Sequence, residues 1–129
     1  MKDRQARESA REYFVPYILG GSAHAHAIAA QIYFRYGIVS LVCDQHSSPI
    51  GSLDPFCRYV RLSPASDSSL IAEQLLALCA QQSYTLPIII PVSKYYEDLA
   101  EAERERLEHK FVISSKETLF SSSPLANIP

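Results

Sequence analysis

The chain alternates short apolar runs with amphipathic segments. The apolar runs have the length of buried strands, and they lie at 14–19, 38–43, 86–92 and 111–113. A further run, which alternates polar and apolar residues as a strand nearer a sheet edge does, lies at 57–62. The segments with apolar residues at helical spacing lie at 24–35, 70–79 and 96–109. This order predicts an α/β fold, a doubly wound and mostly parallel Rossmann-like sheet of about five strands with helices on both faces.

Residues at the ends of these elements carry their own signals. Gly37 follows the first helix and predicts a left-handed C-terminal turn. One of the three residues at 66–68 is expected to cap the next helix, and Ser93 stands where the cap of the following one belongs. The residues expected to form the core of the sheet are Ile18, Leu19, Val39, Leu41, Ile88, Ile89 and Ile90.

The length of 129 residues corresponds to one domain, which we place at 13–120, between a charged lead-in at 1–12 and a tail or linker at 121–129. A formal net charge of −2 gives no electrostatic argument for binding nucleic acid. No apolar run approaches the roughly 20 residues of a membrane helix, and the first residues lack a signal-peptide pattern. The three cysteines are far apart and without a C-x-x-C pair, so reduced thiols in a cytoplasmic protein are expected.

The glycine pair Gly20-Gly21 stands between the first strand and the first helix, where a tight turn lets the backbone approach a ligand. Backbone N–H groups at the start of that helix, around Ser22 and His24, are expected to face the same crevice and favour an anion. A valine in place of Gly21 is expected to fill the approach path and strain any positive φ there. A tight turn that binds nothing is the alternative interpretation.

Asp44 ends the second strand, where dinucleotide-binding folds place a carboxylate that holds a ribose. An aspartate that only forms a turn or caps the next loop would stand at the same position, so Asp44 alone does not decide between the two interpretations. With Ser93 at the end of a neighbouring strand, Asp44 is expected to close the crevice beside the glycine pair.

His24 and His26 do not predict a metal site. Residues two apart on a helix project about 200° apart, so both cannot bind one ion, and no carboxylate or thiol lies close in sequence. We expect His24 to face the crevice and His26 to pack. The chain also lacks a G-x-S-x-G elbow and a phosphate-binding P-loop, so no complete catalytic set is expected.

Four sequence pieces, in a specific order, resemble the N-terminal "pre-ATP-grasp" domain of the ATP-grasp carboxylate–amine ligases, which include biotin carboxylase and the carbamoyl-phosphate synthetase large chain. The pieces are Tyr17 to Gly21 with its helix ending in Phe34 to Val39, Cys43-Asp44 with Phe56 to Val60, Pro87 to Tyr96, and Ser115 to Phe120. Cys57, Lys94 and Ser115 depart from the residues usual in that family, which are serine, aspartate and aspartate.

The resemblance implies the substrate-side domain of an enzyme that activates a carboxylate with ATP and joins it to an amine. Gly20, Gly21, Ser22, His24, Asp44 and Ser93 would then line the substrate side. ATP and Mg²⁺ would be bound by a C-terminal ATP-grasp domain, where Lys116 would contact ATP phosphate only in a longer protein. The partner would be a small carboxylate or amino-acid-like substrate, and a homodimer is compatible with this interpretation.

The chain by itself is therefore expected to bind no cofactor and to show neither ligase nor ATPase activity. Two other function classes remain open from the sequence. One is a stand-alone ligand-binding or regulatory module that keeps the crevice. The other is an NAD(P)-binding fragment, which the missing third glycine of G-x-G-x-x-G disfavours because Ala25 stands near its place.

Overall fold

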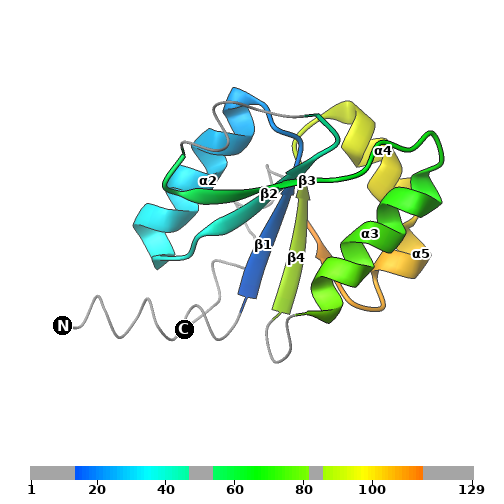
Figure 1. Cartoon of the computed structure of the whole chain (residues 1–129). Coiled ribbons are helices and arrows are strands. Elements are labelled where there is room, and N and C mark those ends of the chain that lie inside the picture. The colour runs from blue at the N-terminus through cyan, green and yellow to red at the C-terminus, as the bar shows by residue number, and fades with distance from the viewer. Residues whose placement is uncertain (1–13, 47–53, 82–85, 115–129) are drawn as a thin grey trace.

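The computed structural model describes residues 14–46, 54–81 and 86–114, and a single sheet runs through them (Figure 1). Its strands are β1 (Phe14–Leu19), β2 (Ser40–Asp44), β3 (Cys57–Arg61), β4 (Leu86–Pro91) and β5 (Val112–Ile113). They are ordered β3-β2-β1-β4-β5, and every neighbouring pair is parallel. The predicted Rossmann-like α/β fold is confirmed, with a sheet that is wholly rather than mostly parallel. β3 lies at an edge, as its alternating pattern predicted.

The helices are α2 (Ala23–Tyr36), α3 (Ser68–Ala80), α4 (Lys94–Ala102) and α5 (Arg104–Leu107). Gly37 takes the predicted left-handed conformation after α2, with φ 72°. Asp67 caps α3 by accepting a hydrogen bond from the Ser69 amide. The prediction of a single helix at 96–109 is wrong. The helical segment begins two residues earlier, at Lys94, and it is divided at Glu103. The φ of −107° and ψ of 18° at Glu103 lie outside the helical region.

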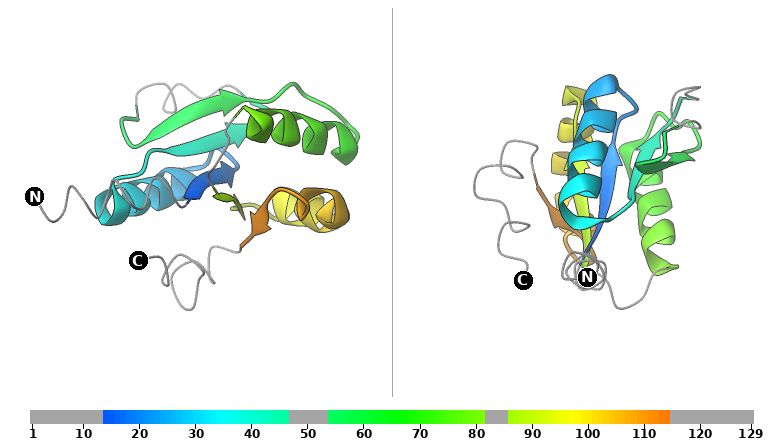
Figure 2. Two further views of the ribbon diagram at one scale, coloured as in Figure 1. Left: turned by 90° about the horizontal axis from the view of Figure 1, so that it is seen from below. Right: turned by 90° about the vertical axis from the view of Figure 1, so that its left-hand side faces the viewer.

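Each face of the sheet has its own core, because successive side chains of a strand point to opposite faces. The core under α2 contains Phe14, Ile18, Ile28, Ile32, Val42, Ile88 and Ile90. The core under α3, α4 and α5 contains Tyr17, Leu19, Leu41, Ile71, Leu75, Ile89, Leu99 and Leu107. The left panel of Figure 2 shows α2 on one side of the strands and the other three helices on the opposite side. The doubly wound arrangement follows from these two apolar faces.

Val39 is the one predicted core residue that the structure places elsewhere, since it is 46% exposed. β2 begins one residue later, at Ser40, so Val39 belongs to the connection from α2. The other six residues predicted for the core are buried.

The strand order reverses between β1 and β4. From β1 the chain moves to β2 and β3 on one side, and then returns to place β4 and β5 on the other. Connections leave the two central strands in opposite directions at this point, which in open α/β sheets leaves a crevice at the carboxyl ends. The amide of Val92 donates to Leu19 O at 3.0 Å and holds these two ends side by side.

Several predictions from the sequence lie outside the described residues: the lead-in at 1–12, the last turn through Phe120, Lys116 and the tail at 121–129. Among the helices that the structure does describe, none is both long and apolar enough to cross a lipid bilayer.

Candidate functional site

The turn after β1 brings the glycine pair against the ends of β2 and β4. Gly20 has φ 119°, a conformation that side chains rarely adopt, and a Cβ at Gly20 would lie 2.9 Å from Val92 Cγ2. The expectation of positive φ thus applies to Gly20 and not to Gly21. A Cβ on Gly21 would instead lie 3.0 Å from Asp44 Oδ2. Gly20 is thus constrained by its backbone conformation and by a close contact, whereas Gly21 is constrained only by close side-chain contacts.

The amides of both glycines have protein acceptors. Gly20 N donates to Cys43 O and Gly21 N donates to Asp44 Oδ2, both at 2.9 Å. A ligand that binds to this turn therefore meets the amides at the start of α2 rather than those of the glycine pair. Ser22 caps that helix, and its Oγ accepts from the Ala25 amide at 3.3 Å.

Asp44 is the centre of the site. Besides the Gly21 amide, it accepts the Gln45 amide at 2.7 Å and the Tyr96 hydroxyl at 2.8 Å, both on Oδ1. The half-buried carboxyl group thereby joins the glycine turn, the end of β2 and the first turn of α4. Three donors directed at one carboxyl group hold it in a single orientation.

Tyr96 reaches Asp44 because Ser93 starts α4 beside the end of β4. Ser93 Oγ accepts the Tyr96 amide at 3.3 Å, as its position after an apolar strand predicted. Burial raises the pKa of the Tyr96 phenol, and the hydrogen bond to Asp44 acts in the same direction. Tyr96 is therefore a protonated donor throughout the ordinary pH range.

A cavity of about 570 Å³ opens above these groups at the carboxyl ends of the central strands. The residues that line it are Gly20, Gly21, Ser22, Asp44, Gln45, His46, Ser93, Tyr95 and Tyr96. Five of the predicted site residues meet here although they come from three separate parts of the chain. His24 is exposed and does not line the cavity, and Lys116 lies outside the described residues.

Sequence reasoning did not predict four of the lining residues as site residues, namely Gln45, His46, Tyr95 and Tyr96. Gln45 Nε2 donates to the Tyr95 hydroxyl at 3.1 Å, while Gln45 Oε1 accepts the Ala65 amide at 3.2 Å. Tyr95 and Tyr96 entered only as part of a family motif. A usable signal existed: an aromatic residue in the first turn after a cap at a strand end lies at the same sheet edge as Asp44.

The cavity combines a carboxyl group at its floor with two helix N-termini at its sides. α2 starts after Ser22 and α4 starts after Ser93, and the unpaired amides of a first helical turn favour negative charge. Asp44 favours a cation or a hydroxyl donor. The arrangement suits a small ligand that carries both an amine and an acid.

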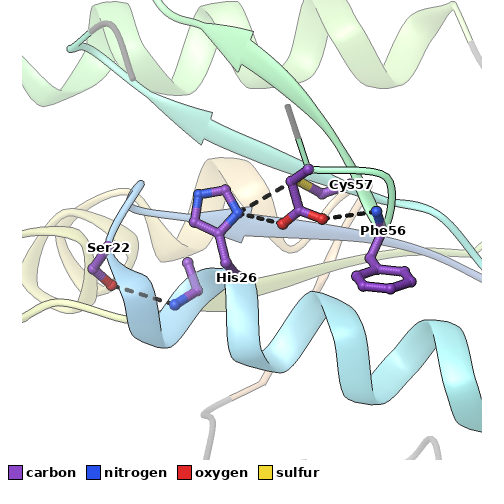
Figure 3. Close-up of polar contacts among 6 residues, drawn as sticks. Ser22, His26, Phe56 and Cys57 are labelled. Carbon is purple, nitrogen blue, oxygen red and sulfur yellow. Dashed lines mark hydrogen bonds and ion pairs between the residues drawn. The ribbon is translucent and has the colours of Figure 1, made fainter. Parts of the chain in front are cut away.

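A second polar cluster lies one turn further along α2. His26 Nδ1 is 2.6 Å from Asp54 Oδ2 and 3.6 Å from Cys57 Sγ, contacts that Figure 3 marks with dashed lines. His26, which was expected to pack, has a side chain that is only 12% exposed, and it also contacts a carboxyl group and a thiol that lie 28 and 31 residues away in the sequence. Burial alone would raise the pKa of Asp54, but hydrogen bonds from the Phe56 amide and His26 lower it. Burial, with nearby Asp54, raises the pKa of Cys57 to about 12.

No family model, curated protein or solved structure matches the chain. The cavity and the order of the sequence motifs are therefore the features from which a function can be inferred.

Proposed function

We propose that this chain is the N-terminal, substrate-side domain of an ATP-grasp carboxylate–amine ligase, and that its cavity binds an amino-acid-like substrate. One observation carries the proposal. Gly20-Gly21, Asp44 and the segment that begins at Ser93, which the resemblance selects from three distant parts of the sequence, line one cavity. ATP and Mg²⁺ would be held by a following domain, and activity, like a cytoplasmic location, is proposed for the longer protein.

The chemistry of the cavity supports an amino acid over a simple carboxylate. The Asp44 carboxyl group repels an anion placed directly on the glycine turn, and the Gly21 amide is already bonded to it. An ammonium group near Asp44 and a carboxylate near the first turn of α2 or α4 would satisfy both parts of the cavity.

The same hydrogen bond disfavours a dinucleotide. A diphosphate would need the glycine-turn amide, and a ribose would need the acidic side chain at the end of β2. Here the Gly21 amide and Asp44 are bonded to each other. Both groups would have to release one another before a dinucleotide could bind.

Binding to the chain can be tested by nuclear magnetic resonance titration with amino acids, their N-acetyl and amide derivatives, ATP and NAD. We expect amide shifts around Ser22 and Ser93 with free amino acids, and weaker binding when either the amine or the carboxylate is blocked. Asp44→Asn should abolish binding, and Tyr96→Phe, which removes a donor but no charge, should weaken it less. Glu105→Gln, an exposed change on α5, is the control. Stronger binding of NAD or ATP than of any amino acid would overturn the proposal.

The ligase assignment has its own test in the protein expressed from its whole reading frame. We expect the protein to form ADP only when both a carboxylate and an amine are present. Asp44→Asn should reduce this ADP formation more than Glu105→Gln does. Amino-acid binding without any ATP turnover by that protein would favour a stand-alone binding module instead.

A further inference from the structure

The cluster of His26, Asp54 and Cys57 lies outside the cavity and joins three segments. His26 is the fourth residue of α2, Asp54 precedes β3, and Cys57 is the first residue of β3. The side chains of His26 and Asp54 are only 12% and 9% exposed, and Cys57 is buried. The three ligand-type atoms all lie within 4.8 Å of one another.

The contacts converge on a single nitrogen atom. Asp54 Oδ2 and Cys57 Sγ both approach His26 Nδ1. A Cys–His–Asp proton relay would need two ring nitrogens, one for the thiol and one for the carboxyl group. Because both side chains contact the same nitrogen, they cannot form that relay. A metal ion, in contrast, needs its ligand atoms to surround one point, and these three atoms do so.

We propose that His26, Asp54 and Cys57 form a binding site for a divalent transition metal, with Zn²⁺ the ion that this donor set fits best. Imidazole, thiolate and carboxylate together are the borderline-soft ligands that zinc accepts, whereas Mg²⁺ and Ca²⁺ prefer oxygen alone. Three protein ligands leave the fourth tetrahedral position to water or to an atom of a bound molecule.

The distances are compatible with this ion after a small change. Tetrahedral zinc with ordinary bond lengths separates a nitrogen and a sulfur ligand by about 3.5 Å, and a nitrogen and an oxygen ligand by about 3.3 Å. The observed Nδ1 to Sγ distance of 3.6 Å already agrees. The 2.6 Å between Nδ1 and Asp54 Oδ2 is a hydrogen bond that would lengthen as the ion enters. Binding would release the thiol proton to solvent, and the imidazole would have to be neutral with its proton on Nε2, so that the Nδ1 lone pair is free for the ion.

Two further contacts hold the ligands in place without a metal. The Phe56 amide donates to Asp54 Oδ1 at 2.8 Å, so that Oδ2 faces His26 (Figure 3). The Phe56 ring lies against Tyr33 and Phe34 of α2, with centroids 5.1 and 5.0 Å apart. These contacts fix the segment before β3 on the helix that carries His26, which is the positioning that a metal site requires.

Cobalt substitution tests this site directly. Chelator-treated chain is titrated with Co²⁺, and we expect one equivalent to produce a thiolate-to-cobalt charge-transfer band that Zn²⁺ then removes. Cys57→Ser should abolish the band. His26→Ala and Asp54→Asn should each weaken zinc affinity at least tenfold in competition with a chromogenic chelator.

The chain offers matched controls for two ligands. His24→Ala changes an exposed histidine on the same helix, and Cys79→Ser changes a buried thiol on α3; both should retain the band and the parent affinity. A band that survives Cys57→Ser, or zinc affinity equal in the parent and in Asp54→Asn, would overturn the proposal. If Cys57→Ser does not fold, loss of affinity in the Asp54→Asn variant decides the question. The result is independent of the ligase proposal.

Discussion

The hydroxyl of Tyr96 donates to Asp44 Oδ1 at 2.8 Å and so connects the first turn of α4 to the end of β2. The same hydroxyl accepts the Gln45 amide at 3.3 Å, and the other oxygen of Asp44 accepts the Gly21 amide. One carboxyl group therefore organises the three segments that surround the cavity. Its removal should affect stability as well as binding.

For the Asp44–Tyr96 pair, we expect Asp44→Asn to lower the free energy of unfolding by about 1–3 kcal/mol, because the amide side chain cannot accept all three donors. Tyr96→Phe should lower it by about 1 kcal/mol. Urea unfolding of both single variants and the double variant measures the coupling. Strictly additive losses would mean that the two side chains do not interact in solution.

Alanine substitutions at the glycine pair should differ in effect. Gly20→Ala combines φ 119° with a 2.9 Å approach to Val92 Cγ2, and we expect a loss of about 2 kcal/mol or more. Gly21→Ala meets the side chains of Asp44 and Tyr59 at 3.0 and 3.2 Å, which can shift, so its loss should be smaller. Thermal unfolding of the two variants checks the order, and the reverse order would contradict the described turn.

Tyr17 carries a buried hydroxyl that has no hydrogen-bond partner among the described residues. Its ring packs edge-on against Phe111 with centroids 5.1 Å apart, and phenylalanine would keep that contact. Tyr17→Phe should therefore raise the free energy of unfolding by about 1 kcal/mol, since an unsatisfied buried polar group is costly. Tyr36→Phe changes a tyrosine on the opposite face of the sheet and serves as the control, for which we expect no gain in the free energy of unfolding. Destabilisation by Tyr17→Phe would show that the hydroxyl has a partner.

The fold should lose stability at alkaline pH. Burial raises the pKa of Cys43 from 9.0 to about 12 and that of Tyr17 from 10.0 to about 12. As pH rises, the unfolded chain releases these protons first, so stability is full below about pH 9 and falls between pH 9 and 12. Urea midpoints at pH 8 and 10.5 measure the fall, and Tyr17→Phe should reduce it. A midpoint unchanged over this interval would contradict the prediction.

Ile89→Ala tests the central strand. The side chain is fully buried in the core under α3, α4 and α5, and truncation of such an isoleucine typically costs about 2–5 kcal/mol. Val39→Ala removes a 46% exposed side chain and should cost far less. Urea unfolding compares the two variants. Equal losses would mean that the strand does not occupy the core position described for it.

Patterns that depend on local chemistry predicted the structure well. The bounds of β1, the left-handed turn at Gly37 and the cap at Ser93 all follow from residues within one turn of the feature. The division of the last helix at Glu103 was not predicted, because helical periodicity continues through this residue. Glu103 accepts a hydrogen bond from Ser68 on α3, a tertiary contact that the periodicity does not contain.

The candidate site was predictable in part for the same reason. Strand ends in a parallel sheet meet at one edge, so the sequence alone predicted that Gly20, Asp44 and Ser93 lie together. The bond between Gly21 and Asp44 and the approach of Asp54 to His26 depend on side-chain directions set by packing. No sequence spacing encodes them.

The pairing of β1 with β4 has a consequence for biosynthesis. Phe14 pairs with Leu86 and Leu19 pairs with Pro91. The ribosome therefore synthesises β1 early and its partner β4 late. A nascent chain that ends after β3 has an open side on β1 and lacks Ile88 and Ile90, which complete the core under α2. Such long-range pairing slows folding and leaves apolar strands exposed meanwhile. We therefore expect the core under α2 to form only after β4 has been synthesised, and the unpaired apolar edge of β1 to be most prone to aggregation before that point.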